Sequence, residues 1–241
     1  MRIICLGNIY GNVHLINEYL YRSKADFALI CGNISICGRN KNKYLPKSFN
    51  EKNNFYEYLE GKQLFIKPVF SIRGIYDDFY LVKKLIERDI NIHNFRIIED
   101  GTVVKYNNIA IGGYGGTYSP LYYKKENLIG YQKKHFNEKE VNSLTDKIID
   151  ILLVYDLIGG VTKKKIEFSE ETLNMFIKTQ CLYCLIGIND WWGLAPMPGK
   201  NVISLPKATE GYLIIEPDKE WRAEGVRFDV SLNRHKRESN D

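Results

Sequence analysis

Five short apolar segments of this chain each end in a sharp turn, and this arrangement constrains the fold more than any other feature. The segments are RIICLG (residues 2–7), FALICG (27–32), VFSIRG (69–74), DILLV (150–154) and CLIG (184–187). Short, continuous apolar runs are typical of strands that are buried on both faces of a parallel sheet. Ligands of α/β proteins bind where the carboxyl ends of such strands point. We therefore expect the five turns to converge on one site.

Segments with the apolar spacing of helices lie between these strands, so the expected fold class is α/β. They cover residues 13–24, 55–62, 77–89, 138–148 and 169–180. Residues 95–116 are expected to form short strands joined by Asp-Gly and Asn-Asn turns, and residues 201–206, 210–217 and 225–232 to form antiparallel strands. The pattern predicts a layered α/β sandwich with two central sheets, in a single domain over residues 1–230. Residues 231–241 are expected to be a polar, basic and mobile tail.

The composition is that of a soluble globular protein, with 44% hydrophobic and 26% charged residues. No apolar run approaches the roughly 20 residues that span a bilayer, and the N-terminus lacks the pattern of a secretory signal. We therefore expect a cytoplasmic protein without membrane contact. The five cysteines, an odd number, are expected to be reduced and buried. Cys181 and Cys184 have the spacing of a redox or zinc motif, but two inward positions of a strand explain them more simply.

The turns after the five strands carry short motifs in a characteristic order. They are NIY (residues 8–10), GN (32–33), GIYD (74–77), YD (155–156) and GIND (187–190). In order and spacing the chain resembles the calcineurin-like metallophosphoesterases, whose motifs at these places are D-x-H, G-D, G-N-H-D, a single H and G-H-x-H. The resemblance implies a four-layer α/β/β/α sandwich of the metallophosphoesterase type, with two mixed sheets flanked by helices. In that superfamily two metal ions activate a hydroxide that attacks a phosphate ester.

Every metal-ligand position implied by this resemblance carries a different residue here. The eight positions are Asn8, Tyr10, Asn33, Ile75, Tyr76, Tyr155, Ile188 and Asp190. Amide and hydrocarbon groups cannot neutralise two divalent cations, and phenols with a pKa of about 10 are poor ligands at neutral pH. We therefore expect a pseudoenzyme without a metal cofactor. Its tyrosines at these positions are expected to stack and to share hydrogen bonds with the two asparagines.

An alternative keeps a single metal ion at the same place. Asp77, Asp156, Asn189 and Asp190 are oxygen donors beside the altered positions and could form one Mg²⁺ or Ca²⁺ site. The protein would then be a phosphodiesterase with an atypical metal site. Asp77 also has a structural explanation, because an acidic residue is favoured in the first turn of the helix expected over residues 77–89.

Within the superfamily the chain most resembles the RNA lariat debranching enzymes. The similar segments are FYEYLEG (residues 55–61), VVKYNNIAIGGYGG (103–116) and SPLYYKK (119–125), in the same order as in those enzymes. The resemblance implies a partner that is RNA or a ribonucleoprotein.

Residues 112–136 are the strongest candidate for a binding surface, since glycines, tyrosines and lysines alternate there. The candidate residues are Tyr114, Tyr118, Tyr122, Tyr123, Lys124, Lys125, Lys133 and Lys134. Aromatic rings stack on bases and lysines bind phosphates. The alternative is a solvated loop with some of its tyrosines buried. Basic runs at residues 39–47, 163–165 and 234–237, with a net charge of +5, add to the preference for RNA.

Trp191 and Trp192 follow the last motif, at the rim of the expected site. Neighbouring residues of a strand point to opposite faces, so one tryptophan can be in the core and the other can contact a base or a partner protein. Packing of both in the core is an equally good explanation. The sequence thus favours a catalytically inactive binding module for RNA, and the alternative is a protein-binding scaffold without RNA contact.

Overall fold

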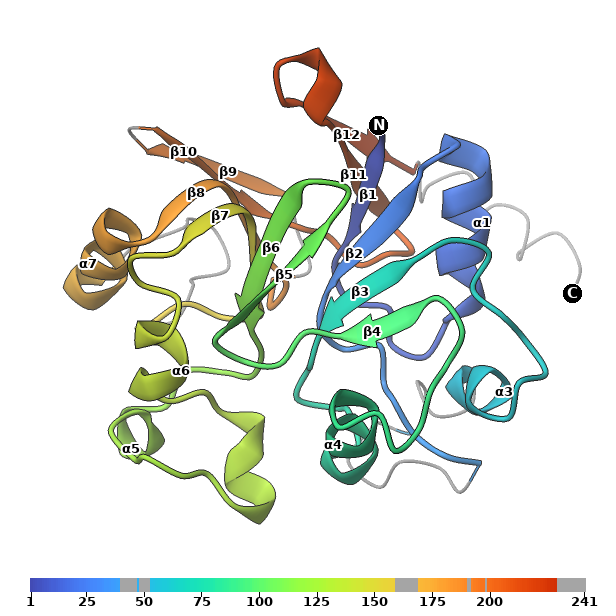
Figure 1. Ribbon diagram of the computed structural model, residues 1–241, viewed down its shortest axis with the longest axis horizontal. Coiled ribbons are helices and arrows are strands. Elements are labelled where there is room, and N and C mark those ends of the chain that lie inside the picture. Colours follow the sequence, from blue (N-terminus) through green and yellow to red (C-terminus); the bar gives the residue numbers. More distant parts are fainter. Residues whose placement is uncertain (40–46, 48–52, 159–168, 190–191, 198, 229–241) are drawn as a thin grey trace, which may run out of the picture.

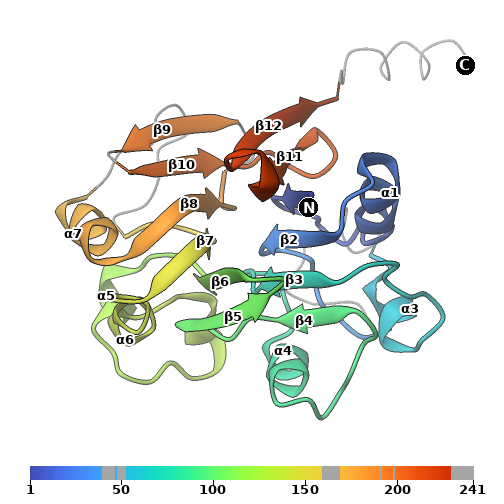
Figure 2. The ribbon, with the colours of Figure 1, turned by 45° about the horizontal axis from the view of Figure 1, so that its top comes forward.

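Two six-stranded mixed sheets form the centre of the molecule (Figures 1 and 2). The computed structural model describes residues 1–39, 47, 53–158, 169–189, 192–197 and 199–228. The expected tail and the basic runs at residues 163–165 and 234–237 lie outside this part of the chain, as does most of the run at 39–47.

The first sheet has the strand order β12-β11-β1-β2-β3-β4. Its parallel strands are β1 (Ile3–Leu6), β2 (Phe27–Cys31), β3 (Val69–Ile72) and β4 (Phe95–Ile97), and β11 (Gly211–Glu216) and β12 (Arg222–Arg227) are antiparallel to their neighbours. Every residue of β1, β2 and β3 is buried, as their continuous apolar runs predict. The outer side of this sheet carries α1 (His14–Ser23), α3 (Phe55–Leu59) and α4 (Phe79–Ile86) (Figure 1).

The second sheet has the strand order β5-β6-β7-β8-β10-β9. The four central strands are parallel: β6 (Ile109–Tyr114), β7 (Ile148–Val154), β8 (Gln180–Ile186) and β10 (Lys200–Ser204). The antiparallel edges are β5 (Thr102–Tyr106) and β9 (Gly193–Met197). On the outer side lie α5 (Pro120–Tyr123), α6 (Glu138–Asn142) and α7 (Glu170–Lys178), while the short 3₁₀ helices are η1 (Gly130–Lys134) and η2 (Pro217–Lys219).

The expectation of antiparallel strands in the C-terminal part holds only in part. Strand β10, which comes from a segment expected to be antiparallel, is parallel to β8. The antiparallel partner of β10 is β9. The sequence does not predict β9 as a strand, because this segment includes a proline. An edge strand tolerates proline because only one of its sides has to form ladder hydrogen bonds. The antiparallel pairing of β11 and β12 is confirmed.

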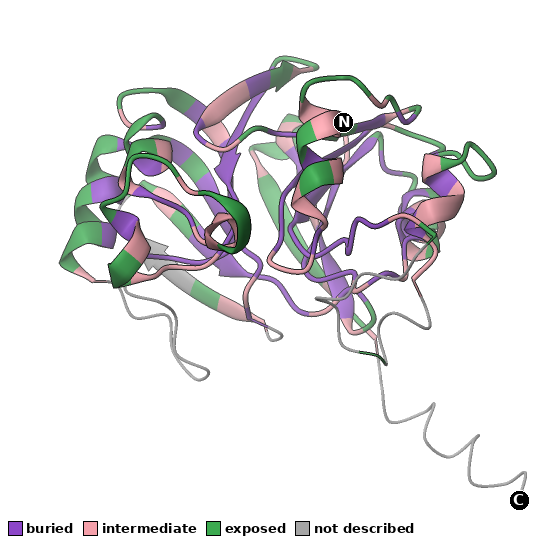
Figure 3. Ribbon diagram, turned by 90° about the horizontal axis from the view of Figure 1, so that it is seen from below, coloured by how far each residue is buried: buried purple, intermediate pink, exposed green. Residues whose placement is uncertain are grey.

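Side chains that alternate along the strands build three hydrophobic cores between four layers. Ile4 and Leu6 of β1 pack toward the helices of the first sheet, whereas Ile3 and Cys5 pack between the two sheets. Strand β7 follows the same alternation, with its even-numbered residues 152 and 154 in the core that faces the helices of the second sheet. Figure 3 shows the buried strands inside and the more exposed helices around them. The predicted α/β/β/α sandwich is therefore confirmed.

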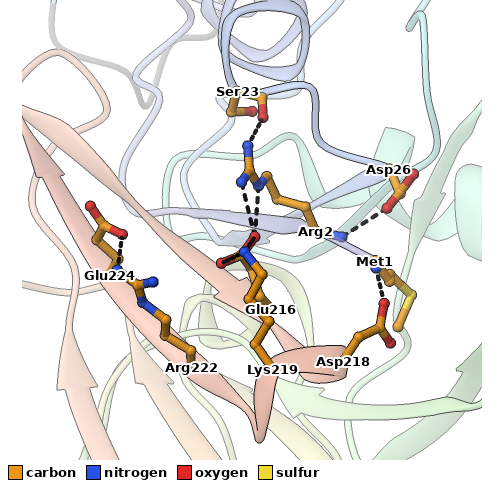
Figure 4. A network of polar contacts seen from close by, with 9 residues as sticks. All are labelled: Met1, Arg2, Ser23, Asp26, Glu216, Asp218, Lys219, Arg222 and Glu224. Carbon is orange, nitrogen blue, oxygen red and sulfur yellow. Dashed lines mark hydrogen bonds and ion pairs between the residues drawn. The ribbon is translucent and has the colours of Figure 1, made fainter.

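A polar network joins the start of β1 to the end of β11 (Figure 4). Arg2 donates to Glu216 Oε1 at 2.9 Å from Nη2 and to the Ser23 carbonyl at 2.8 Å from Nη1. Lys219 also contacts the Glu216 carboxylate, at 3.0 Å. Hydrogen bonds from Lys219 and then from Arg2 lower the pKa of Glu216. The network connects the C-terminal end of α1 with both strands, and so it fixes the first strand between its neighbours.

Candidate functional site

The loops that follow β1, β2, β3, β7 and β8 meet in one hydrogen-bonded cluster, as expected. Asn33 Nδ2 donates to Asn8 Oδ1 at 2.8 Å and to the Tyr155 hydroxyl at 2.6 Å. Asn33 Oδ1 accepts from the backbone N–H of Tyr76 at 3.2 Å. Asn8 Nδ2 donates to the Gly187 carbonyl at 2.9 Å, which brings in the last loop. One buried asparagine, Asn33, is thus the centre of the site.

Glycines at the strand ends allow the loops to approach this closely. A Cβ atom at Gly74 would lie 2.0 Å from Asn33 N, and one at Gly187 would lie 1.9 Å from Cys31 O. Both distances are far below van der Waals contact, so any side chain at these two positions would push the loops apart. The glycines of the motifs therefore set the backbone geometry, whatever residues occupy the ligand positions.

Aromatic and aliphatic side chains fill the remainder of the site. The rings of Tyr10 and Tyr76 are in tilted contact, with centroids 6.2 Å apart. Tyr155 is 3% exposed and belongs to the core between the sheets, against which Ile75 and Ile188 also pack. Of the contacts expected among the three tyrosines and the two asparagines, the Tyr10–Tyr76 ring contact and the Tyr155–Asn33 hydrogen bond are therefore present.

The buried carboxylate of Asp77 connects two of the loops. Its Oδ1 accepts from the backbone N–H groups of Ser35 and Ile36, both at 2.8 Å, and its Oδ2 accepts from Gly74 N at 2.6 Å. Burial raises the pKa of Asp77, and the three N–H donors oppose this shift. The expectation that Asp77 lies in the first turn of α4 is wrong, because Asp78 is the N-cap and α4 begins at Phe79.

Asp156 has a similar structural role at the end of β7. Its Oδ2 accepts from Tyr118 N at 3.0 Å and its Oδ1 from Leu157 N at 2.8 Å. Burial raises the pKa of Asp156 to about 6, while hydrogen bonds from the two backbone groups act in the opposite direction. The carboxylate thus holds the start of the tyrosine-rich segment against the end of β7.

The side chains at the altered ligand positions, together with Asp77, do not fit a centre of two metal ions. The amide oxygens of Asn8 and Asn33 already accept hydrogen bonds within the site, and the carboxylate oxygens of Asp77 accept three more. Two divalent cations require several negative ligands, and neutral amides and phenols cannot provide that charge. In the part of the chain that the structure describes, no group of three His, Cys, Asp or Glu side chains could hold a metal ion. Asp190, one of the eight positions, lies outside that part.

Two of the tyrosines proposed to stack on RNA bases are buried, which corrects that prediction. Tyr114 is completely buried in β6 and its ring lies 4.8 Å from that of Phe136, while Tyr123 is 8% exposed. Both belong to the core under α6 and α7, so their rings are not available to a ligand. Tyr118 is half-buried against Tyr123. The alternative of a loop with some tyrosines in the core is correct for these residues.

The remaining candidates of this segment are at least partly accessible. Tyr122 stacks on His135 with centroids 4.9 Å apart, and the Lys125 ammonium lies 5.1 Å from the Tyr122 ring. Lys124 is exposed and forms an ion pair with Glu138 at 2.6 Å. Lys133 and Lys134 are half-buried and lie in η1.

Arg73, at the end of β3, holds the η1 segment in place. Its Nη2 donates to the His135 carbonyl at 2.9 Å, its Nη1 donates to the Lys133 carbonyl, and its Nε forms an ion pair with Asp100. Glu140 lies 3.9 Å from Nη2, and burial followed by repulsion from Asp100 raises the pKa of Glu140 to about 7. The sequence offers no sign of this connection, because the partners of Arg73 are 27 to 67 positions away.

A groove lies beside the closed site, between α4 and η1. It has a volume of about 640 Å³, and its lining includes Tyr76, Tyr80, Lys83, Tyr131, Lys133 and Lys134. Tyr80, Lys83 and Tyr131 are absent from the predicted binding residues. Tyr80 and Lys83 lie on α4, which reads as a purely structural helix, whereas Tyr131 lies in η1, within the segment 112–136 but outside the residues predicted there. The sign of this surface in the sequence is an aromatic residue together with lysines on one helix. Surface helices often show the same combination without binding any ligand.

Trp192 lies at a different place, at the edge where the two sheets end. Its ring packs on Gly225, and the Arg227 guanidinium is 5.8 Å from it. These residues line a second groove of about 500 Å³, together with Tyr183 and the exposed Leu194. Trp191 lies outside the described residues, so the prediction of one buried and one exposed tryptophan stays open.

Comparison with known proteins places this architecture in a class. The structure of TT1561 from Thermus thermophilus superimposes with a TM-score of 0.62 at 13% identity, covering 94% of this chain and 98% of that chain. The structure of GAP50, the anchor in the inner membrane complex of Plasmodium, gives a TM-score of 0.53 at 12% identity, covering 95% of this chain and 89% of that one. At this level of identity the likeness concerns the fold alone. The chain has the metallophosphoesterase-type fold.

The chain is also similar in sequence to a known enzyme. The chain is 22% identical over 173 residues to a lariat debranching enzyme of Arabidopsis thaliana, which corresponds to 65% of this chain. The matched region is only 40% of that enzyme's length. No protein-family model matches the chain. Among the described helices, none is both long and apolar enough to cross a bilayer.

Proposed function

We propose that the protein is a catalytically inactive module of the metallophosphoesterase fold that binds RNA, alone or within a ribonucleoprotein. The observation that carries this proposal is the closed hydrogen-bond network of Asn8, Asn33 and Tyr155 at the strand ends. Buried polar groups that lose their partners cost about 1–3 kcal/mol each. In this network each side chain has a partner from the protein itself, so the site is stable without a cation.

The RNA part of the proposal is supported by similarity and by charge. The chain is similar to a lariat debranching enzyme, and it has a net charge of +5. Lys133 and Lys134, beside the closed site, have no carboxylate partner in the part of the chain that the structure describes. Lysine ammonium groups of this kind bind phosphates and release counterions.

The first test is binding of a fluorescently labelled single-stranded RNA, measured by anisotropy in about 50 to 200 mM salt. The affinity is expected to fall steeply as salt rises, because lysine–phosphate contacts release counterions. The same RNA is then incubated with the protein and Mg²⁺, Mn²⁺ or Zn²⁺, and the products are separated by size. We expect intact RNA in every case. Metal-dependent cleavage would overturn the assignment as inactive, and failure to bind RNA at low salt would overturn the binding role.

A second candidate function is a protein-binding scaffold, and one observation favours it. Leu194 is 66% exposed beside the half-buried Trp192, at the groove between the sheet edges. Tryptophan is enriched among the residues that dominate the binding energy of protein interfaces. Sedimentation of the native protein with and without nuclease separates the two functions. A large particle that nuclease breaks down would support the RNA-binding function. A complex that resists nuclease would support the protein-binding function.

A further inference from the structure

The groove between α4 and η1, called here the α4–η1 groove, has two walls from distant parts of the chain. Tyr80 and Lys83 come from α4, and Tyr131, Lys133 and Lys134 come from η1. Figure 1 shows α4 and the segment after α5 at the same end of the molecule. Tyr76 and Ile75 form the part of the lining nearest to the closed site. The volume of about 640 Å³ is in the usual range of ligand pockets, roughly 300–1,000 Å³.

Two tyrosine rings of this groove are unusually accessible. Tyr80 is 65% exposed and Tyr131 is 61% exposed. Each ring has an ammonium group over one face: Lys84 Nζ is 4.6 Å from the Tyr80 centroid, and Lys134 Nζ is 3.7 Å from the Tyr131 centroid. Neither ring has an aromatic neighbour among the described residues. An exposed ring beside a cation is suited to a flat, electron-rich partner with a phosphate close by, which is the chemistry of a nucleotide.

The charge of the groove is positive. Its lining contains Lys83, Lys133 and Lys134, but only one carboxylate, that of Asp78. Asp78 Oδ1 accepts from Tyr80 N and Leu81 N at 2.9 and 3.3 Å, so this carboxylate caps α4. Lys83 has a loose contact of 3.6 Å with the exposed Glu87, an ion pair of the kind that contributes little in water. The groove therefore favours an anion.

Both walls are fixed to the body of the protein. The N-cap Asp78 defines the start of α4, and Arg73 binds the carbonyl groups of Lys133 and His135 on the other side. Arg73 and Gly74 both follow β3, and the turn after Gly74 leads into α4. The same turn borders the closed site, so it joins the two walls of the groove. A groove with fixed walls does not need to be ordered by its ligand, which favours affinity.

We propose that the α4–η1 groove binds single-stranded RNA, with bases stacked on Tyr80 and Tyr131 and phosphates bound by Lys83 and Lys133. This inference rests on the proposed RNA-binding function and names the site and the form of RNA. In a duplex the bases are stacked inside the helix and cannot reach the tyrosines, so double-stranded RNA does not use these contacts. The contacts are made to π-faces and to the backbone, and so the site discriminates weakly between sequences.

The test uses the full chain and three labelled probes of equal length: a single-stranded RNA, the same RNA in a duplex, and a strand with abasic positions. Variants Tyr80→Leu and Tyr131→Leu remove the stacking surface at exposed positions. Each is expected to weaken single-stranded RNA binding roughly 5- to 100-fold. Lys83→Ala and Lys133→Ala are expected to flatten the plot of log affinity against log salt by about one unit per lost phosphate contact. The duplex and the abasic strand are expected to bind more weakly than the intact strand.

Two matched controls come from surfaces away from the groove. Tyr21→Leu changes a tyrosine that is 80% exposed on α1, and Lys105→Ala changes an exposed lysine of β5; both are expected to bind RNA like the unaltered protein. If the groove variants bind single-stranded RNA as tightly as these controls, the groove is not the site and the inference is wrong, although the RNA-binding function stands. Equal affinity for the duplex would also overturn the inference. Absence of binding to any probe would instead remove the proposed function itself.

Discussion

At the scale of single residues, side chains at the positions where the resemblance implies metal ligands hold neighbouring loops together. Asn33 donates two hydrogen bonds and accepts one, and its partners belong to three other loops. The motif order identifies Asn33, Asn8 and Tyr155 as altered ligand positions, and also suggests that they share hydrogen bonds. The pairing itself could not be predicted, because an amide has two donors and two lone pairs and the sequence does not define which neighbour each one faces.

A prediction at this scale concerns the pH dependence of stability through Asp156. Its carboxyl has a pKa of about 6 in the folded protein, above the value of about 3.9 in an unfolded chain. The folded state therefore binds more protons between these pH values, and the free energy of unfolding falls as pH rises, by roughly 3 kcal/mol in total. In Asp156→Asn this part of the slope should be absent, which urea unfolding between about pH 4 and pH 8 measures.

The matched control for Asp156 is Asp146→Asn, at an exposed position. It should keep the slope of the unaltered protein. Glu140, whose pKa is also raised, contributes to the slope in all three proteins and cancels in the comparison. If the free energy of unfolding of Asp156→Asn had the same slope against pH as that of the control, the pKa of Asp156 would not be raised by folding.

At the scale of elements, patterns with a clear period and clear end signals were predictable. The helix expected over residues 169–180 is present as α7, and Ser169, the first residue of that range, caps it by accepting from Thr172 N at 3.1 Å. The tyrosine-rich segment was only partly predictable. It folds into α5 and η1, which are shorter than two helical turns, so no hydrophobic period distinguishes the buried Tyr123 from the exposed Tyr131. Long-range contacts decide which tyrosines are buried.

The η1 segment depends on a single buried cation, and this gives a second prediction. Arg73→Met should lower the free energy of unfolding by about 2–3 kcal/mol, because it leaves the partly buried Asp100 without its ion-pair partner. It should also weaken RNA binding, since the carbonyls of Lys133 and His135 lose their donor. Urea unfolding and the anisotropy assay measure the two effects.

A double variant separates these effects. Adding Asp100→Asn to Arg73→Met removes the uncompensated charge but retains an acceptor for Gly115 N, which Asp100 binds at 2.7 Å. Stability should recover in part, while RNA binding should stay weak because the arginine is still absent. Recovery of both properties together would mean that Arg73 acts on RNA binding only through global stability.

At the scale of the whole molecule, the sequence predicted the layers but not the complete order of strands. Alternation along β1 and β7 places side chains in two cores each, which is what a four-layer sandwich requires. The position of β9 was missed, because an edge strand with a proline resembles a turn in the sequence. Strand order depends on contacts between distant segments, and apolar patterns do not encode them.

The shared core between the sheets predicts that the domain unfolds as one unit. Trp192 and Trp221 pack against that core, and strands of both sheets contribute to it. Tryptophan fluorescence and far-UV circular dichroism should therefore give the same midpoint in urea. Two separate midpoints would contradict the expectation of a single domain over residues 1–230.

The frame of the strand-end site is held by backbone contacts rather than by the side chains at the ligand positions. Asp77 accepts three backbone N–H groups, and Gly74 and Gly187 lie against the backbone of neighbouring loops. Architecture and chemistry are therefore separable in this protein. Substitutions at the loop tips can remove a reaction without loss of the fold, whereas a methyl group added at Gly74 or Gly187 would disturb all five loops. The same frame could therefore carry very different side chains at its loop tips without a change of fold.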